Sequence, residues 1–221
     1  MKARKIGDTM SVFDEIEWDE VRQHYDERVE THERLLQLHD GNLRKEFFRL
    51  ALGIERNAGN YSAAEHGIGP RIGAENTNYE ERVFKLATEL RGLTNGRSVP
   101  KAVRDAGLRY LAVGVGSELS CMVNPTVCWV ANTRTIWTHL VVKHADNVAV
   151  ADEALKLYRD GDASSEMAYK IWTAIHRELD TAMTRIADLG TSRAKDADVE
   201  PGDIKYLWAD AIANYLYTAH H

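Results

Sequence analysis

Hydrophobic and polar residues alternate with a helical period along nearly the whole chain. Apolar side chains recur at three- and four-residue spacing, which places them on one face of an α-helix. The expected helices cover residues 14–39, 43–54, 79–90, 98–122, 125–143, 146 or 147 to 158, 162 or 164 to 190, and 204–217. No segment has a convincing strand period, and no internal repeat is present. The pattern therefore predicts an all-α fold, a helical bundle of about eight helices with a buried central helix.

Two stretches interrupt this pattern. Residues 57–78 hold four glycines, a proline and four asparagines, with almost no periodicity. Loops of this length are uncommon in compact domains, so we interpret the stretch as a lid or an assembly arm, or else as a disordered segment. Residues 191–203 are polar and contain a Pro-Gly pair, which indicates a linker. The predicted organisation is a helical core domain over 1–190 with an acidic N-terminal helix, this linker, and a C-terminal helix within 204–221.

The composition is typical of a globular chain. Its 221 residues are 44% hydrophobic and 28% charged, a balance that supports a core and excludes a disordered or fibrous protein. The best apolar stretch, 108–130, is interrupted by a glutamate, an asparagine and a proline, so we expect no membrane-spanning helix. Basic residues 1–5 are followed by no apolar stretch of the signal-peptide kind. Cys121 and Cys128 are expected to be buried free thiols of a cytoplasmic protein.

Charge is distributed unevenly. Residues 14–34 hold nine acidic side chains against three arginines, which equals the whole net charge of −6. Residues 91–109 hold five basic side chains against one acidic side chain. A basic stretch of this kind faces phosphate or an acidic partner surface, or it is a solvated face neutralised by the acidic helix of the same or a neighbouring chain. We favour the second interpretation.

The segment 125–143 carries the candidate chemistry. Asn124 before Pro125 predicts that a helix begins there. Its apolar side chains point in all directions, which indicates the buried central helix. Arg134 lies on it, and a buried guanidinium requires an anion. That anion is either an internal acid, such as Glu118, or a substrate phosphate.

Residues 134–139, Arg-Thr-Ile-Trp-Thr-His, resemble the Arg-x4-His motif of the HEPN ribonucleases, all-α proteins of toxin and defence systems. The resemblance implies metal-independent cleavage of RNA, with Arg134 binding the scissile phosphate and His139 helping to activate the 2′-hydroxyl. Thr135 follows the arginine where that family usually has Asn, Asp or His. On a regular helix the two catalytic candidates lie roughly 140° apart, so they share a cleft only across a dimer or a local distortion. In that family a dimer supplies the cleft.

Two further sets of polar residues remain. Asn132, Thr135, His139 and Lys143 form a polar stripe, which lines a pocket, a dimer seam or solvent, and we favour the seam. His24, His32 and His39 follow one helical stripe at spacings of eight and seven. They are about 11 Å apart along a helix axis, too far to share one ion. We therefore expect no metal and no cofactor.

These observations leave two hypotheses of function. In the first, the chain is a non-enzymatic assembly or interaction protein that forms homo- or hetero-oligomers, such as a viral or multisubunit structural component. Its contacts would be the acidic arm (residues 14–34), the glycine-rich stretch (residues 57–78) and the aromatic C-terminal helix (within 204–221). In the second, it is a HEPN-like ribonuclease with Arg134 and His139 as catalytic residues and RNA as partner. We favour the first, because a nuclease of this size more often has a basic surplus.

Overall fold

Helices form over most of the chain, as the hydrophobic period predicts. The computed structural model describes residues 11–54, 59–159 and 165–221, and within these residues no strand occurs. The helices are α1 (Trp18–Asp40), α2 (Arg44–Ala51), α3 (Tyr61–Glu65), α4 (Ile68–Glu75), α5 (Tyr79–Arg91), α6 (Val99–Asp105), α7 (Val113–Val123), α8 (Thr133–Lys143), α9 (Val148–Arg159), α10 (Glu166–Asp196) and α11 (Lys205–His220). Two short 3-10 turns cover Ser11–Phe13 and Gly96–Ser98. The all-α prediction is confirmed, with eleven α-helices in the described residues instead of about eight.

The predicted helix start at Pro125 is wrong. α7 ends at Val123, and the chain runs irregularly until α8 begins. The Asn124 side chain donates hydrogen bonds to the carbonyls of Leu90 and Leu93, each at 3.0 Å, and so holds the end of α5. α8 instead starts at a capping box: Asn132 Oδ1 accepts from the backbone N–H of Thr135, and Thr135 Oγ1 accepts from that of Asn132. Asn132, and not Asn124, is therefore the residue that caps the start of α8.

Three other predicted segments have different bounds. The segment 98–122 is divided into α6 and α7 by a turn in which Gly107 and Tyr110 have positive φ angles. The glycine-rich stretch 57–78 contains α3 and α4, although residues 57 and 58 lie outside the described part. α10 continues to Asp196, so only the second half of the predicted linker is non-helical. The two residues predicted as possible starts of this helix, 162 and 164, lie outside the described residues, and α10 is capped by Ser165.

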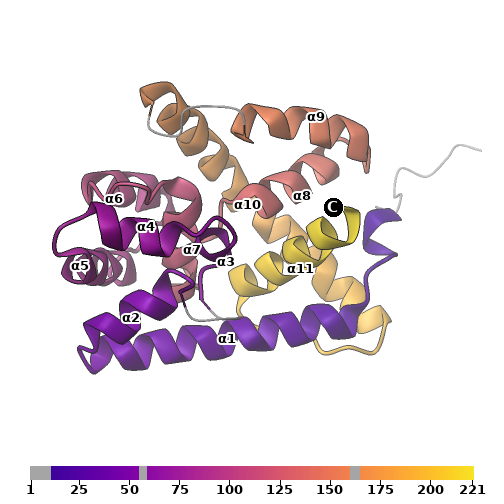
Figure 1. Cartoon of the computed structure of the whole chain (residues 1–221). Coiled ribbons are helices and arrows are strands. Elements are labelled where there is room, and N and C mark those ends of the chain that lie inside the picture. The colour runs from indigo at the N-terminus through magenta and orange to yellow at the C-terminus, as the bar shows by residue number, and fades with distance from the viewer. Residues whose placement is uncertain (1–10, 55–58, 160–164) are drawn as a thin grey trace, which may run out of the picture.

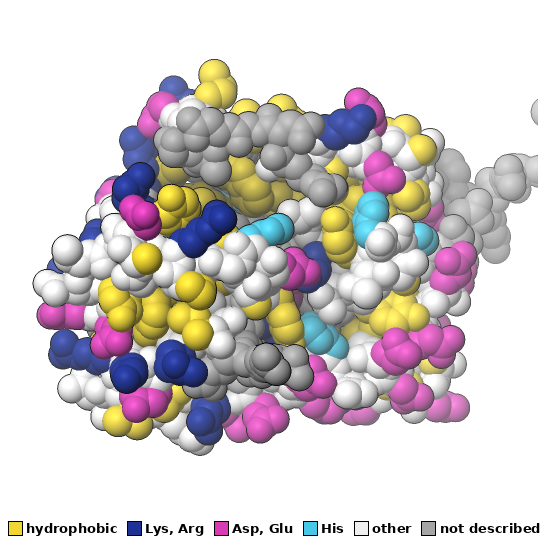
Figure 2. All heavy atoms as spheres, in the orientation of Figure 1, with side chains coloured by type: hydrophobic (Ala, Val, Ile, Leu, Met, Phe, Trp, Pro, Cys, Tyr) yellow, Lys and Arg dark blue, Asp and Glu magenta, His cyan; other side chains and the backbone are white. Residues whose placement is uncertain are grey.

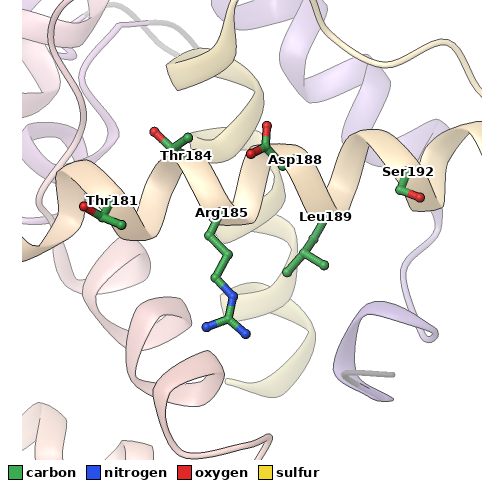
Figure 3. Close-up of a pocket in the computed structure, with 6 residues that line it drawn as sticks. All are labelled: Thr181, Thr184, Arg185, Asp188, Leu189 and Ser192. Atoms are coloured by element: carbon green, nitrogen blue, oxygen red, sulfur yellow. The ribbon is translucent and has the colours of Figure 1, made fainter. Parts of the chain in front are cut away.

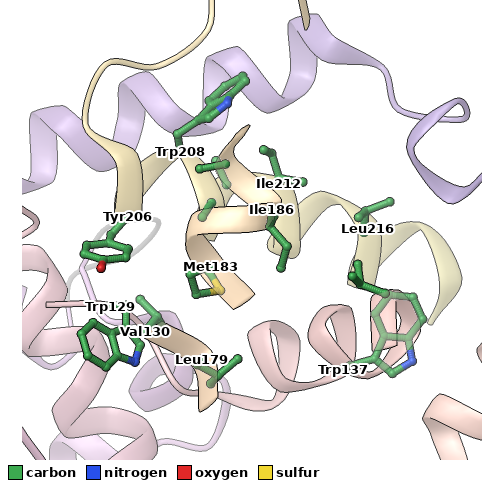
Figure 4. Packing of buried hydrophobic residues seen from close by; sticks show 14 of the residues in the cluster. Trp129, Val130, Trp137, Leu179, Met183, Ile186, Tyr206, Trp208, Ile212 and Leu216 are labelled. Atoms are coloured by element: carbon green, nitrogen blue, oxygen red, sulfur yellow. The ribbon is translucent and has the colours of Figure 1, made fainter. Parts of the chain in front are cut away.

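The buried hydrophobic residues form two clusters, and α1 spans both. The first cluster joins the start of α1 to α8, α9, α10 and α11. Figure 4 shows part of it, with Ile212 of α11 beside Ile186 of α10 and the Trp208 ring pointing toward α1. The second cluster joins the end of α1 to α2–α7. In Figure 1, α1 runs along one side of the molecule beneath both groups of helices.

The most continuously buried helices lie where the clusters meet. In α7 every residue except Gly114 is buried, and in α11 residues 206–213 are all buried. α8 is buried along most of its length, but it is not the only central helix. The C-terminal aromatic helix therefore belongs to the core and is not an exposed contact. None of the described helices is both long enough and apolar enough to cross a lipid bilayer.

Candidate functional site

The junction between the two hydrophobic clusters is occupied by a buried arginine. Arg28 of α1 is fully buried, and its Nη2 lies 3.4 Å from Glu118 Oε1 of α7 and 3.2 Å from Asp210 Oδ2 of α11. Its Nη1 donates to the carbonyl of Gly59 at 2.8 Å. We call Arg28, Glu118 and Asp210 the Arg28 cluster. It joins three helices that are far apart in the sequence.

Glu118 has a second function, which is to hold α3 in place. Its carboxylate accepts hydrogen bonds from the backbone N–H of Tyr61 at 2.7 Å and from the Ser62 hydroxyl at 2.6 Å. The first N–H groups of a helix have no internal partners and favour a negative charge nearby. Asn60 adds a cap through its side-chain oxygen, which accepts from the N–H of Ala63. The short helix is therefore fixed at its start by a carboxylate that also faces Arg28.

The Arg28 cluster contains two carboxylates for one guanidinium. Burial raises the pKa of Asp210 to about 6, and the nearby Glu118 carboxylate acts in the same direction, while Arg28 opposes both. Removing one member of such a buried set leaves a charge without compensation, at a cost of about 3–5 kcal/mol. The cluster has the burial and partners of a structural ion pair.

A second group of polar side chains lies beside this cluster and reaches the surface. Arg134 of α8 forms an ion pair with Glu65 of α3; the guanidine side chain is 12% exposed and the carboxylate side chain 53%. The His24 ring lies 5.4 Å from the Tyr61 ring. The Arg28 guanidinium also lies over the Tyr61 ring, with its Cζ 5.0 Å from the ring centre. We call His24, Tyr61, Glu65 and Arg134 the Arg134 rim.

His24 and Arg134 each have a buried nitrogen that lacks a hydrogen-bond partner in the described part of the chain: Nε2 of His24 and Nε of Arg134. Burial, together with the nearby guanidinium groups of Arg28 and Arg134, lowers the pKa of His24 to about 3. The imidazole is therefore neutral at physiological pH. Nε and Nη2 of Arg28 also lack a hydrogen-bond partner among the described residues, but Arg28 is fully buried and faces two carboxylates, whereas His24 and Arg134 belong to a group that reaches the surface.

The two motif residues do not share one site within the chain. Whereas Arg134 contacts Glu65, His139 Nε2 lies 3.3 Å from Glu178 Oε2 of α10. Burial lowers the pKa of His139, which makes it a weaker candidate for a protonated imidazole. The expectation that Glu118 pairs with Arg134 is wrong: Glu118 pairs with Arg28.

The four residues of the polar stripe have partners inside the chain. Asn132 and Thr135 cap α8 and are buried. His139 and Lys143 both face Glu178, with the lysine Nζ at 3.5 Å. The stripe therefore joins α8 to its own cap and to α10, and its contacts do not require a dimer seam.

The other two histidines of the predicted histidine stripe, His32 and His39, contact neighbouring residues of the same chain. His32 Nδ1 lies 2.6 Å from the carbonyl of Met122, and His39 stacks on Phe84 at 4.3 Å between ring centres. Among the described residues, no group of three or more His, Cys, Asp and Glu side chains is arranged to hold a metal ion. Cys121 and Cys128 are buried free thiols, as expected.

The basic segment 91–109 is neutralised by the same chain. Its five cations each form an ion pair: Arg91 with Asp40, Arg97 with Asp180, Lys101 with Asp105, Arg104 with Glu166, and Arg109 with Glu75. None of these acids lies within 14–34. The segment is a neutralised face, but the expectation that the acidic helix of the same chain neutralises it is wrong, because all five partners lie outside residues 14–34.

The acidic arm remains exposed. Six of its acids are exposed and form no ion pair within the described residues: Glu15, Glu17, Asp19, Glu20, Glu30 and Glu33. Figure 2 shows acidic side chains gathered along the lower edge of the molecule, where α1 runs in Figure 1. The net charge of −6 therefore lies on the first part of α1 and the short segment that precedes it.

A shallow hollow on α10 carries no recognisable chemistry. It is lined by Thr181, Thr184, Arg185, Asp188, Leu189 and Ser192 (Figure 3). All six residues come from one helix, so these residues provide no opposing wall to enclose a ligand. We therefore assign no function to it.

Sequence reasoning missed the central member of the site, Arg28. The actual buried stripe of α1 runs through Val21, Tyr25, Arg28, Leu35 and Leu38. This helical spacing of Arg28 with buried apolar residues is the sequence signal that could have identified it.

Comparisons with known protein families, curated proteins and solved structures found no match to this chain. The site must therefore be interpreted from its own chemistry.

Proposed function

We propose that this protein is a non-catalytic interaction protein that binds a basic partner through the exposed acidic face of α1. The observation that carries the proposal is the charge balance. The cations of the basic segment are matched by acids of the same chain, whereas six acids of the arm have no ion-pair partner within the described residues. Uncompensated charge of one sign on one face steers and selects partners of opposite sign.

The partner is a different chain rather than a second copy. A two-fold contact through α1 would bring acidic side chains against each other, and like charges in contact disfavour an interface. The chain's own basic segment is already engaged in ion pairs. The proposed assembly is therefore hetero-oligomeric, with a lysine- or arginine-rich surface opposite α1.

Neutralisation of the face tests this proposal. The test variant carries Asp19→Asn, Glu20→Gln, Glu30→Gln and Glu33→Gln, all at exposed positions without ion pairs among the described residues. The control carries the same change of charge elsewhere: Glu46→Gln, Glu89→Gln, Asp196→Asn and Asp198→Asn. Binding of a poly-lysine peptide is measured by calorimetry at low and high salt.

We expect the α1 variant to lose several-fold more affinity than the control, with the difference disappearing at high salt. Equal losses in the two variants would show that only net charge matters and would contradict an α1 contact surface. Sedimentation velocity of the wild-type protein and the α1 variant provides a second check. Stronger self-association of the variant than of the wild-type protein would agree with like-charge repulsion across this face.

Cleavage of RNA is a second candidate function, with Arg134 and His139 as catalytic residues. One observation favours it: both side chains are partly exposed, at 12% and 13%, and both lie on α8 beside half-exposed carboxylates. Because they contact separate partners within the chain, this mechanism requires a second copy to complete the cleft. An RNA cleavage assay with EDTA tests it. Cleavage abolished by either Arg134→Ala or His139→Ala would support a ribonuclease, and intact RNA with the wild-type protein would exclude it.

A further inference from the structure

The guanidinium of Arg134 uses only half of its binding edge. One edge of an arginine presents Nε and Nη2 side by side, in a geometry that matches the two oxygens of a carboxylate. Glu65 contacts Nη2 through a single oxygen, Oε1. The neighbouring Nε is buried and has no hydrogen-bond partner in the described residues. A ligand that displaces Glu65 would therefore meet two nitrogens without another hydrogen-bond partner among the described residues.

His24, which is close enough to Arg134 for the guanidinium charge to lower the pKa of its imidazole, provides a second unused donor. Its Nε2 is buried without a partner among the residues described, and its Nδ1 lies 3.9 Å from Glu27, beyond hydrogen-bond distance. No hydrogen bond therefore fixes the tautomer, and Nε2 is free to carry the proton and donate it to an acceptor. The Tyr61 ring, 5.4 Å from the imidazole, supplies an aromatic wall.

We propose that Arg134, His24 and Tyr61 form a binding site for a small carboxylate ligand, and that Glu65 occupies this site when the ligand is absent. Glu65 is suited to this role because its side chain is 53% exposed and extends from the short helix α3. Rotation of that one side chain into water uncovers the guanidinium. The ion pair between Glu118 and Arg28 and the cap on α3 stay in place during the exchange.

The charge of the surroundings favours a carboxylate over phosphate. Arg28 is already matched by Glu118 and Asp210, so the arrangement contains no second free cation for a dianion. A carboxylate that replaces Glu65 leaves the local charge unchanged. A phosphate dianion adds one negative charge close to Asp210, whose carboxyl is already difficult to ionise because it is buried. This site is separate from the acidic face of α1 and does not depend on the function proposed for that face.

The test uses acetate as the probe and compares two variants that each remove one acid facing α8. Glu65→Gln removes the internal competitor. Glu178→Gln is the matched control, because it removes the carboxylate facing His139 and Lys143. Titrations follow the arginine Nε–H signals in ¹H–¹⁵N spectra, which report on Arg134 directly. Inorganic phosphate is titrated in parallel.

We expect Glu65→Gln to bind acetate about tenfold more tightly than the wild-type protein, since a tethered competitor acts at high effective concentration. The Arg134 Nε–H signal should shift in the same titration, and Glu178→Gln should behave like the wild-type protein. Adding Arg134→Lys to Glu65→Gln should abolish the gain. The proposal is overturned if Glu65→Gln gives no gain or if the Arg134 signal does not move. Tighter binding of phosphate than of acetate would overturn the assignment to a carboxylate.

Discussion

The Arg28 cluster and the Arg134 rim place two guanidinium groups in very different surroundings, although each guanidinium contacts a residue of α3, Tyr61 for Arg28 and Glu65 for Arg134. Arg28 is fully buried and lies between two buried carboxylates from two other helices. Arg134 faces a single carboxylate that is half exposed and contributed by a five-residue helix. Loss of a partner leaves a buried charge in the first region, but in the second region the remaining group is able to turn to water. The first region has the features of a structural junction, and the second has those of a binding site.

The largest predicted effect breaks the Arg28 cluster. Arg28→Ala leaves Glu118 and Asp210 facing each other in the core without a cation. We expect the free energy of unfolding to fall by about 3–5 kcal/mol. Chemical denaturation monitored by circular dichroism measures the loss. A loss below about 1 kcal/mol would contradict the structural role that separates this region from the Arg134 rim.

A second prediction uses pH, because burial shifts the pKa values of one group in each region in opposite directions: it lowers that of His24 and raises that of Asp210. The pKa of His24 is lowered from 6.5 to about 3, so the native state excludes a proton that the unfolded chain binds. The stability that depends on neutral His24 is complete above pH 6.5 and is lost progressively as the pH falls towards 3. The pKa of Asp210 is raised to about 6, so its protonation offsets part of this loss as the pH falls from 6 towards 4.

His24→Phe isolates the histidine contribution, since Asp210 is present in both proteins. Between pH 7 and pH 5 the variant should lose about 2 kcal/mol less stability than the wild-type protein, because 1.5 pH units separate pH 5 from the unfolded pKa. Denaturation curves at the two pH values provide the measurement. Parallel pH profiles for the two proteins would show that His24 is accessible to water and titrates normally.

The smallest effect is expected at the Arg134 rim. Arg134→Ala removes one partner of an ion pair whose carboxylate is 53% exposed, so Glu65 becomes solvated instead of stranded. We expect a loss of at most about 1 kcal/mol. The same denaturation experiment that tests Arg28→Ala checks this value. A loss as large as that of Arg28→Ala would mean that the two regions do not differ in the way proposed here.

Local patterns were sufficient to predict many of the helices. α5 is expected over 79–90 and observed over Tyr79–Arg91, because the apolar period through Val83, Leu86 and Leu90 coincides with its buried face. The start of α8 was misplaced because Asn124 and Pro125 also form a valid helix-start signal. That asparagine instead bonds to carbonyls at the end of α5, a tertiary contact that local pattern does not reveal.

The candidate site was harder to predict than the fold. Arg134 was identified as a guanidinium in need of an anion, but its partner comes from a segment with no helical period. Arg28 is hidden among the charges of residues 14–34, where an arginine reads as one more solvent-facing side chain. The buried face of α1 passes through Tyr25, Arg28 and Leu35. An arginine at a core position makes sense only once the carboxylates of α7 and α11 are brought to it, which requires the whole fold.

The pairing of Arg28 with Asp210 also has a consequence for the order in which this chain folds during synthesis. The second hydrophobic cluster draws on residues up to Cys128 and is available while the ribosome is still adding the rest. The first cluster requires both Trp18 and the last helix, so it closes only after α11 has emerged. Until then the apolar start of α1 and the guanidinium of Arg28 have no permanent cover. Nascent chains stalled before residue 205 should therefore be the forms most often bound by chaperones or cut by proteases.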